Sequence, residues 1–302
     1  MNKIKSLLRS ENGVVLLGNV AASAIGLLSF MLLARSLTKS DFGEWALFIS
    51  AAGLIDLMRT GLVRQGMVRA FNTADNESDK NTIIASSGFL SVGITVLSAL
   101  VIATLGVLVD WSNWSMNLFF DYYPVLAVAT LLWNFDTWVA HASGSYRRMN
   151  LLRLGVNGLF ISFLLIGLLT PFSLEQYLWG YIGAQLLVSL VVVKHLSKYK
   201  WRMIRRKTVL SLLHFGKHSL ATLAGSNLLK SADNLIIGAM MGTEAVAVFA
   251  IPMKVLDVME IPLRGFVMTA YRNLTIKYKN NDLIEYKRLL KKNIGLLTLL
   301  CF

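Results

Sequence analysis

Eight long apolar runs divide the chain, and each is long enough to cross a lipid bilayer as a helix. About 20 helical residues bridge the roughly 30 Å of hydrocarbon in a membrane. The predicted spans are Gly13–Leu33, Gly43–Val63, Thr82–Val109, Asn117–Ala140, Leu151–Thr170, Leu174–Val193, Gly216–Met241 and Ala245–Ala270. A ninth run begins near Asn293 and stops at Phe302, too short a length to cross. The runs predict an all-α polytopic membrane protein.

Composition agrees with this fold class and excludes several functions. The 302 residues are 55% hydrophobic and 16% charged, and the mean hydropathy of +0.57 is too apolar for a soluble domain. The net charge of +13 does not indicate nucleic acid, because the basic residues lie between the apolar runs. The single cysteine and the four unclustered histidines predict neither a metal site nor a cofactor.

Basic residues alternate between the two sides of the predicted membrane. They gather before span one and after spans two, four, six and eight, where Arg64 and Arg153 are counted as loop residues. The opposite loops hold only Arg35 and Lys39, so the positive-inside rule places the N-terminus in the cytoplasm. Trp45 and Trp138 are interpreted as anchors at the membrane interface.

The basic segment 194–207 is the natural boundary between two halves of the chain. Beyond it, the sequence of the first spans is weakly repeated at a fixed offset, so that Asp56 aligns with Glu260 and Gly61 with Gly265. A repeat of six spans contains an even number of crossings, so both copies enter from the cytoplasm, as in transporters built from parallel repeats. We therefore predict an N-terminal lobe over residues 1–207 and a partial second lobe over residues 208–302.

Ionised side chains inside the predicted spans are the strongest functional signal, because charge at membrane depth is costly and usually marks a substrate or ion pathway. They are Asp56 and Arg59 in span two, Lys230 and Asp233 in span seven, and Lys254, Asp257, Glu260 and Arg264 in span eight. Acid and cation stand three or four residues apart and can pair along their own helix. The alternative is that these pairs are neutralised and only hold helices together.

The functional interpretation is a watery cavity with a mixed, partly cationic lining. The candidate substrate-binding residues are Arg59, Lys230, Lys254, Arg264 and Asn227, because cations attract an anionic group such as a phosphate. The candidates for ion coupling or charge tuning are Asp56, Asp233, Asp257 and Glu260. Asp121 and Asp136 lie near opposite ends of span four and are interpreted as carboxylates solvated at the interface.

The segment Leu32–Gly66 resembles the polysaccharide transporter (oligosaccharide flippase, Wzx-like) family of the MATE-like MOP superfamily. The recognisable parts are the end of span one at Leu33-Ala34-Arg35, the turn Asp41-Phe42-Gly43 and the aromatic Trp45. A second segment, from Ser231 to Pro262, is similar to the seventh and eighth helices of that family. The family has twelve or more helices, so we expect this chain to be a C-terminally truncated form.

The resemblance implies two six-helix lobes around a central cavity lined largely by helices one, two, seven and eight. It also implies that the protein flips undecaprenyl-diphosphate-linked oligosaccharide across a bacterial inner membrane by alternating access. That glycan is an O-antigen, capsule or exopolysaccharide repeat unit. The partners implied are this substrate and membrane lipids, with a glycan polymerase and chain-length proteins as candidates.

Three alternatives to this function are considered. The first is a MATE-type cation-coupled multidrug antiporter, which would favour an acidic cavity. Spans two, seven and eight together hold four cations and four acids, and this balance disfavours the antiporter. A membrane enzyme such as an O-antigen polymerase needs a large outward loop, whereas Pro171–Ser173 and Gly242–Glu244 are short turns. We therefore do not expect an enzyme. A non-transporting membrane partner of glycan synthesis is the third.

Overall fold

The computed structural model describes residues 11–109, 115–256 and 283–301, without the side chains of residues 11–17, 226–230, 283, 292 and 296–301. The chain divides into two compact units, Met1–Ile251 and Pro252–Phe302, and each is described by itself. The predicted lobes, residues 1–207 and 208–302, are a different division and stay a prediction.

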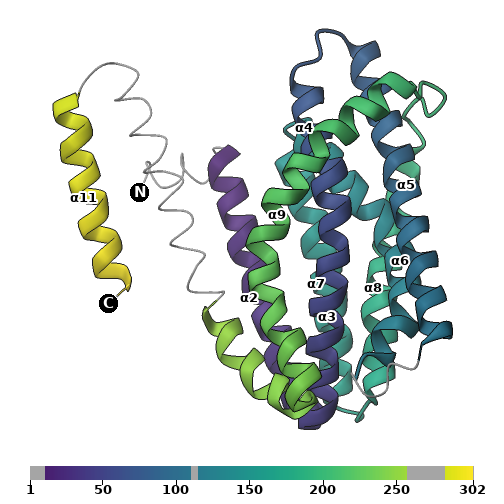
Figure 1. Ribbon diagram of the computed structural model, residues 1–302, viewed down its shortest axis with the longest axis vertical. Coiled ribbons are helices and arrows are strands. Elements are labelled where there is room, and N and C mark those ends of the chain that lie inside the picture. The colour runs from purple at the N-terminus through teal and green to yellow at the C-terminus, as the bar shows by residue number, and fades with distance from the viewer. Residues whose placement is uncertain (1–10, 110–114, 257–282, 302) are drawn as a thin grey trace. The chain divides into compact units, whose positions relative to one another are not determined.

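The first unit is a bundle of long helices joined by short loops (Figure 1). Its helices are α2 (Glu11–Ser36), α3 (Lys39–Arg59), the π-helical turn η1 (Thr60–Arg64), α4 (Gln65–Asn72), α5 (Glu77–Leu108), α6 (Asn117–Ala142), α7 (Tyr146–Gly167), α8 (Leu174–Leu196) and α9 (Arg206–Met241). Residues 243–256 are also helical, and no strand occurs in the described ranges. The second unit contains α11 (Leu283–Cys301), which runs through Asn293 as one continuous helix.

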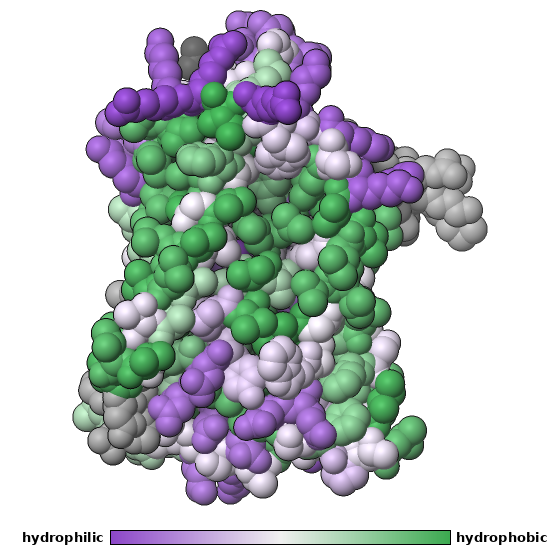
Figure 2. All heavy atoms as spheres, turned by 90° about the vertical axis from the view of Figure 1, so that its right-hand side faces the viewer, coloured by the Kyte–Doolittle hydropathy of each residue, from purple (hydrophilic) through white to green (hydrophobic). Residues whose placement is uncertain are grey.

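Six helices of the described chain are long and apolar enough to cross a membrane. They are Gly18–Ser36, Lys39–Asn72, Glu77–Leu108, Asn117–Ala142, Tyr146–Gly167 and Leu174–Leu196. They match the first six predicted spans, and the prediction of an all-α polytopic membrane protein is confirmed. Figure 2 shows apolar side chains forming a belt between two polar ends on one face of the bundle. The seventh predicted span lies within α9, and most of the eighth lies outside the described residues.

The loops sort into two ends of the bundle. The basic end carries loops 73–76, 143–145 and 197–205, and the short-loop end carries loops 37–38 and 168–173 and Gly242. At the short-loop end, Thr38 caps α3 by accepting a hydrogen bond from the backbone N of Asp41 at 3.2 Å. Gly242 has a φ of 84°, a left-handed value that favours glycine, and it reverses the chain between α9 and the next helix.

The two largest clusters of buried apolar side chains in the described bundle each contain a tryptophan. Trp45 is 5% exposed and stacks on Phe160 with ring centroids 5.7 Å apart, towards the short-loop end. Trp138 is 6% exposed and packs edge-on against Phe135 in the second cluster. The interpretation of these two tryptophans as interfacial anchors is therefore wrong. They belong to the core, because each faces neighbouring helices instead of lipid headgroups.

Helix α9 packs along α3, η1 and α4, and glycines mark the closest approaches of this α3–α9 seam (Figure 1). A Cβ added at Gly216 would lie 2.7 Å from the Cα of Leu62, and one at Gly61 would lie 2.7 Å from the Cα of Leu220. Glycine on both helices thus brings the two backbones together. In a membrane, close packing of small residues replaces the hydrophobic effect as the force that joins helices.

Polar contacts also join the α3–α9 seam. Asn234 Nδ2 donates a hydrogen bond to Ser50 Oγ at 2.9 Å. At the short-loop end, α3 also contacts the helix that follows α9, where the hydroxyls of Ser40 and Thr243 lie 2.9 Å apart. A hydrogen bond between helices in lipid contributes on average about 0.6 kcal/mol, so these contacts fix the register of the seam more than its strength.

Candidate functional site

The structure describes four of the nine predicted cavity side chains. These are Asp56 and Arg59 on α3, Asp233 on α9, and Lys254, which is half-buried in the helical residues 243–256. Asn227 and Lys230 belong to α9, but their side chains are not described. Asp257, Glu260 and Arg264 lie outside the described residues. Their predicted roles, and the pairs expected for Lys230 and Lys254 with nearby acids, therefore stay predictions.

Arg59 is the last residue of α3 and points into the bundle, with 3% of its side chain exposed. Its Nη2 forms an ion pair with Asp56 and donates a hydrogen bond to Thr130 Oγ1 at 2.9 Å. Its Nη1 donates to the carbonyl of Ala127 at 3.1 Å and to Thr95 Oγ1 at 3.3 Å. The guanidinium therefore links α3 to α5 and α6 near the middle of the membrane-spanning helix Lys39–Asn72.

The predicted pairing of Asp56 with Arg59 along one helix is confirmed. Asp56 is the more exposed member, with 40% of its side chain accessible against 3% for Arg59. A buried cation is tolerated when it is paired and hydrogen-bonded, and here one carboxylate and three neutral oxygens meet both conditions. In this conformation Asp56 is thus the accessible partner, and a direct contact of Arg59 with substrate stays a prediction.

Thr95 and Thr130, which hold Arg59, were not predicted from the sequence. A threonine in an apolar helix is ordinary, because its hydroxyl can bond to a carbonyl of its own preceding turn. Both do so, Thr95 to Ser91 at 2.8 Å and Thr130 to Ala127 at 3.1 Å. No sequence pattern indicates that these two threonines accept hydrogen bonds from Arg59 on another helix.

Asp233 and Asn234 are adjacent residues of α9, within the predicted span seven. Asp233 is exposed, whereas Asn234 is half-buried and donates to Ser50 across the α3–α9 seam. Span seven therefore supplies one residue that ties the helices together and one that stays accessible. The exposure of Asp233 is compatible with a coupling role, which no contact in the structure tests.

A cavity of about 530 Å³ lies at the short-loop end, lined in part by Glu44, Asp121 and Trp179. None of the predicted cavity residues whose side chains are described lines it. The predicted cavity between two lobes therefore stays a prediction.

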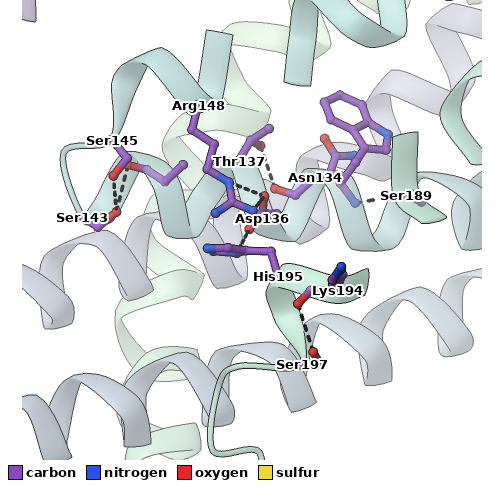
Figure 3. Close-up of polar contacts among 12 residues, drawn as sticks. Asn134, Asp136, Thr137, Ser143, Ser145, Arg148, Ser189, Lys194, His195 and Ser197 are labelled. Atoms are coloured by element: carbon purple, nitrogen blue, oxygen red, sulfur yellow. Dashed lines mark hydrogen bonds and ion pairs between the residues drawn. The ribbon is translucent and has the colours of Figure 1, made fainter. Parts of the chain in front are cut away.

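A second buried polar network surrounds Asp136 and was missed in the sequence (Figure 3). The Asp136 carboxylate is fully buried and is held by Arg148 of α7, with Nη2 at 2.6 Å and Nε at 2.9 Å. His195 of α8 approaches the other oxygen, with Nδ1 at 3.0 Å. The three residues join α6, α7 and α8 on the side of the basic end. This arrangement stabilises the bundle at the place where those helices meet.

The interpretation of Asp136 as a carboxylate solvated at the interface is wrong. Helix α6 continues beyond it to Ala142, so Asp136 lies inside the packed bundle. The only sequence signal was that Asp136 lies near the end of an apolar run. That signal indicates how far along the span a residue lies, but not which face of the helix is buried. Arg148 and His195 belong to other helices, so no spacing within α6 could reveal them.

The substitution Asp136→Asn is expected to lower stability, whereas Asp121→Asn on the same helix is expected to have little effect. Removing one partner of a fully buried ion pair costs about 3–5 kcal/mol. Arg148 and His195 are each 30% exposed, so water screens them and a loss nearer about 2 kcal/mol is expected. Thermal unfolding of the purified protein in detergent measures this difference. Equal melting temperatures for the two variants would show that the network is dispensable.

The helix arrangement is that of MATE-type membrane transporters. An inward-facing multidrug resistance MATE family transporter of the MOP superfamily aligns with a TM-score of 0.77 at 16% identity, covering 92% of this chain and 68% of that chain. The MATE multidrug transporter DinF-BH aligns with a TM-score of 0.62 at 14% identity, covering 97% and 71%. An outward-facing transporter of the superfamily gives 0.58 at 16%, covering 97% and 72%. At these identities the likeness establishes a shared fold.

The family is established by sequence. A model of the polysaccharide biosynthesis protein family matches residues 9–271, and the chain belongs to this family. The resemblance to polysaccharide transporters of the MATE-like superfamily is thus confirmed. Comparison with functionally curated proteins gave no significant match. Family and fold together support a multi-pass membrane transporter, and its relatives by fold are transporters, not enzymes.

Proposed function

We propose that the protein flips an undecaprenyl-diphosphate-linked oligosaccharide from the cytoplasmic to the outer leaflet of a bacterial inner membrane. Its N-terminus would then lie in the cytoplasm, at the basic end of the bundle. The observation that carries this proposal is the Asp56–Arg59 pair near the middle of a membrane-spanning helix, in a chain of the polysaccharide biosynthesis family. Charge kept at that depth is costly and is expected on a transport pathway.

The proposed site combines cations for the diphosphate and acids that tune them. The cations and the amide assigned to substrate are Arg59, Lys230, Lys254, Arg264 and Asn227, and the acids are Asp56, Asp233, Asp257 and Glu260. A diphosphate carries several acceptor oxygens, which suits arginine because its planar fork of donors binds two oxygens at once. A glycan polymerase and chain-length proteins are the proposed partners that receive the product.

The α3–α9 seam supports alternating access as the mechanism. Under this proposal residues 1–207 and 208–302 form the two lobes, so α3 and α9 belong to different lobes and the seam is their contact. Glycine contacts and a few hydrogen bonds, such as that of Asn234 with Ser50, contribute to this contact. Such a surface can rearrange at modest cost, as rocking of one lobe against the other requires.

Reconstitution into liposomes tests the proposal. A fluorescent undecaprenyl-diphosphate oligosaccharide is placed in the inner leaflet, and its arrival outside is followed with a quencher that cannot cross the membrane. Replacing the four cations Arg59, Lys230, Lys254 and Arg264 by glutamine is expected to reduce flipping to the rate of empty liposomes. A control with glutamine at the exposed Lys194 and Lys198 should flip normally. Unchanged flipping in the fourfold variant would refute the assigned site.

A MATE-type multidrug antiporter is the second candidate, favoured by the fold shared with multidrug transporters. It predicts that a sodium or proton gradient drives a cationic dye out of liposomes containing the protein. The proposed flippase predicts no dye movement above that of empty liposomes. Dye efflux without glycan flipping would replace the proposed function by this one, and neither activity would favour a non-transporting partner of glycan synthesis.

A further inference from the structure

The cavity of about 530 Å³ at the short-loop end is separate from the charges predicted to bind substrate. Its walls come from α3, α6 and α8, whose first turns lie at that end of the bundle (Figure 1). Glu44 of α3 lines it, whereas Asp56 lies about 18 Å further along the same helix. The volume falls within the range of about 300–1,000 Å³ that is typical of small-molecule sites. We call it the short-loop cavity.

Two aromatic rings form part of the wall of the short-loop cavity. Tyr122 of α6 and Trp179 of α8 meet edge to face, with ring centroids 5.6 Å apart and ring planes at 75°. Trp179 is 53% exposed, so about half of its surface is uncovered. An exposed tryptophan near the end of a span is often only an anchor in the lipid interface. Trp179 differs because it shares the wall of a cavity with polar side chains of other segments.

Polar residues line the rest of the cavity and offer both acceptors and donors. The carboxylates of Glu44, Asp121 and Glu175 come from three different helices. In the described part of the chain, no ion pair joins any of the three to a cation. Ser115 and Asn117 lie beside them, and a hydroxyl or a side-chain amide can both donate and accept hydrogen bonds.

This combination fits a saccharide better than an ion. Sugar hydroxyls donate to carboxylates and accept from hydroxyl and amide groups, whereas a cation makes no use of donors. A sugar ring also has an apolar face of C–H groups, which can lie on an exposed aromatic ring. Among the described residues, no three acidic or histidine side chains are grouped closely enough to hold a metal ion.

The charge of the short-loop cavity does not require a cationic ligand. Glu175 lies in the first turn of α8, where the helix dipole stabilises an acid. Asp121 and Glu175 are both exposed, so water and salt screen their charges. Figure 2 shows that polar side chains gather at this end of the bundle, below the apolar belt. A ligand rich in hydroxyls therefore meets solvated acceptors at the edge of the membrane.

We propose that the short-loop cavity binds one or a few sugar units of an oligosaccharide. It lies at the end of the bundle opposite the basic end, which is the outward end under the proposed function. There it holds the glycan part of the lipid after transfer across the membrane. This role in transport rests on the proposed function, whereas saccharide binding at the cavity does not.

A glycan array tests the site with the protein purified in detergent. The array carries O-antigen, capsule and exopolysaccharide repeat units without their lipid. The parent is expected to retain at least one of them, and Trp179→Ala is expected to bind it at least tenfold more weakly. Trp179→Phe keeps an aromatic ring and should retain most of the affinity. Retention of no repeat unit by the parent, or equal retention by Trp179→Ala, would overturn the proposal.

Two matched substitutions of glutamate test the role of the carboxylates. Glu175→Gln removes a charged acceptor from the cavity, and Glu244→Gln removes the same charge from an exposed position at the same end, outside the lining. Hydrogen bonds to an ionised group are roughly twice as strong as neutral ones, so Glu175→Gln should weaken glycan binding about fivefold. Glu244→Gln should bind as the parent does. Equal affinities of the two variants would contradict a contact between the carboxylate and the sugar.

Stability and competition separate this site from two alternatives. Trp179 and Glu175 are exposed, so Trp179→Ala and Glu175→Gln should melt close to the temperature of the parent. A lower melting temperature that accounts for the lost binding would indicate a structural role and overturn the site. Tetramethylammonium chloride should displace the glycan no better than sodium chloride at equal ionic strength. Displacement by tetramethylammonium alone would show that the cavity takes an organic cation instead.

The liposome assay distinguishes failure of this site from failure of the proposed function. Absence of flipping, with glycan binding that Trp179→Ala removes, would contradict the proposed function and leave the saccharide site standing. Normal flipping, with glycan binding that Trp179→Ala and Glu175→Gln leave unchanged, would overturn the saccharide site alone.

Discussion

Gly216→Ala is expected to disable the protein, whereas Gly225→Ala on the same helix is expected to be harmless. The Cβ of alanine at position 216 would lie 2.7 Å from the Cα of Leu62, and a backbone atom cannot move aside as the end of a flexible side chain can. Helices α3 and α9 would have to separate. At Gly225 no atom of the described residues lies within 4 Å of the added Cβ. The two substitutions change the chain identically and differ only in what the methyl group meets.

The two substitutions are expected to change the free energy of unfolding in opposite directions. Overpacking at a close helix contact costs about 1–3 kcal/mol and occasionally more, and here the clash is with backbone. In an open helical position, glycine to alanine gains roughly 0.5–1 kcal/mol, because alanine restricts the unfolded chain. Melting temperature in detergent and flipping in liposomes should both fall for Gly216→Ala and should hold or rise for Gly225→Ala. Similar behaviour of the two variants would mean that the α3–α9 seam does not hold the fold together.

Arg59→Met is expected to remove both stability and transport, and a second substitution should restore only the first. The change leaves Asp56 ionised near the middle of the membrane-spanning helix Lys39–Asn72 without its partner, and it strips three oxygens of their donor. Loss of one partner of a buried pair costs about 3–5 kcal/mol. Because 40% of Asp56 remains exposed, we expect the lower end of that range.

The double variant Asp56→Leu/Arg59→Met separates structure from function. Replacing a whole ion pair by apolar residues is often neutral or stabilising, so the melting temperature should recover. Flipping should stay lost if the pair belongs to the transport pathway. Recovery of flipping together with stability would instead show that Asp56 and Arg59 only join α3 to α5 and α6. That outcome would favour the structural alternative for the charges of span two.

The membrane-spanning helices could be predicted from the sequence because hydropathy and length alone determine them. Six predicted spans match six helices, and the turn before α8 at Pro171–Ser173 and the glycine reversal at Gly242 lie where they were expected. In a bilayer every backbone polar group must be satisfied within the helix, so an apolar run of this length has few alternatives.

The surroundings of individual side chains could not be predicted, because they depend on which face of each helix is buried. Trp45 and Asp136 lie near the ends of spans, where lipid headgroups and water were the natural expectation, and both are enclosed by neighbouring helices. The same reasoning assigned Arg64 and Arg153 to loops as markers of membrane orientation. They lie inside helices, because α7 begins at Tyr146 and the helix that contains Arg64 continues to Asn72.

The site was predictable in part for the same reason. Spacing along one helix revealed that Asp56 pairs with Arg59, because residues three apart share a face. Contacts between helices carry no such spacing. The contacts of Thr95 and Thr130 with Arg59 therefore required the folded bundle, in which side chains distant in sequence become neighbours.

The π-helical turn at Thr60–Arg64 gives the second membrane-spanning helix one surplus residue. If that surplus moved towards either end, the segment it passed would turn by about 100°, the angle of one α-helical residue. Arg64, whose Nη2 lies 3.5 Å from His141 Nδ1 of α6, would then leave that helix while the chain kept its length and its hydrogen bonds. Such a shift would rotate part of the helix about its own axis, and it would change the partner of a side chain without bending the bundle around it.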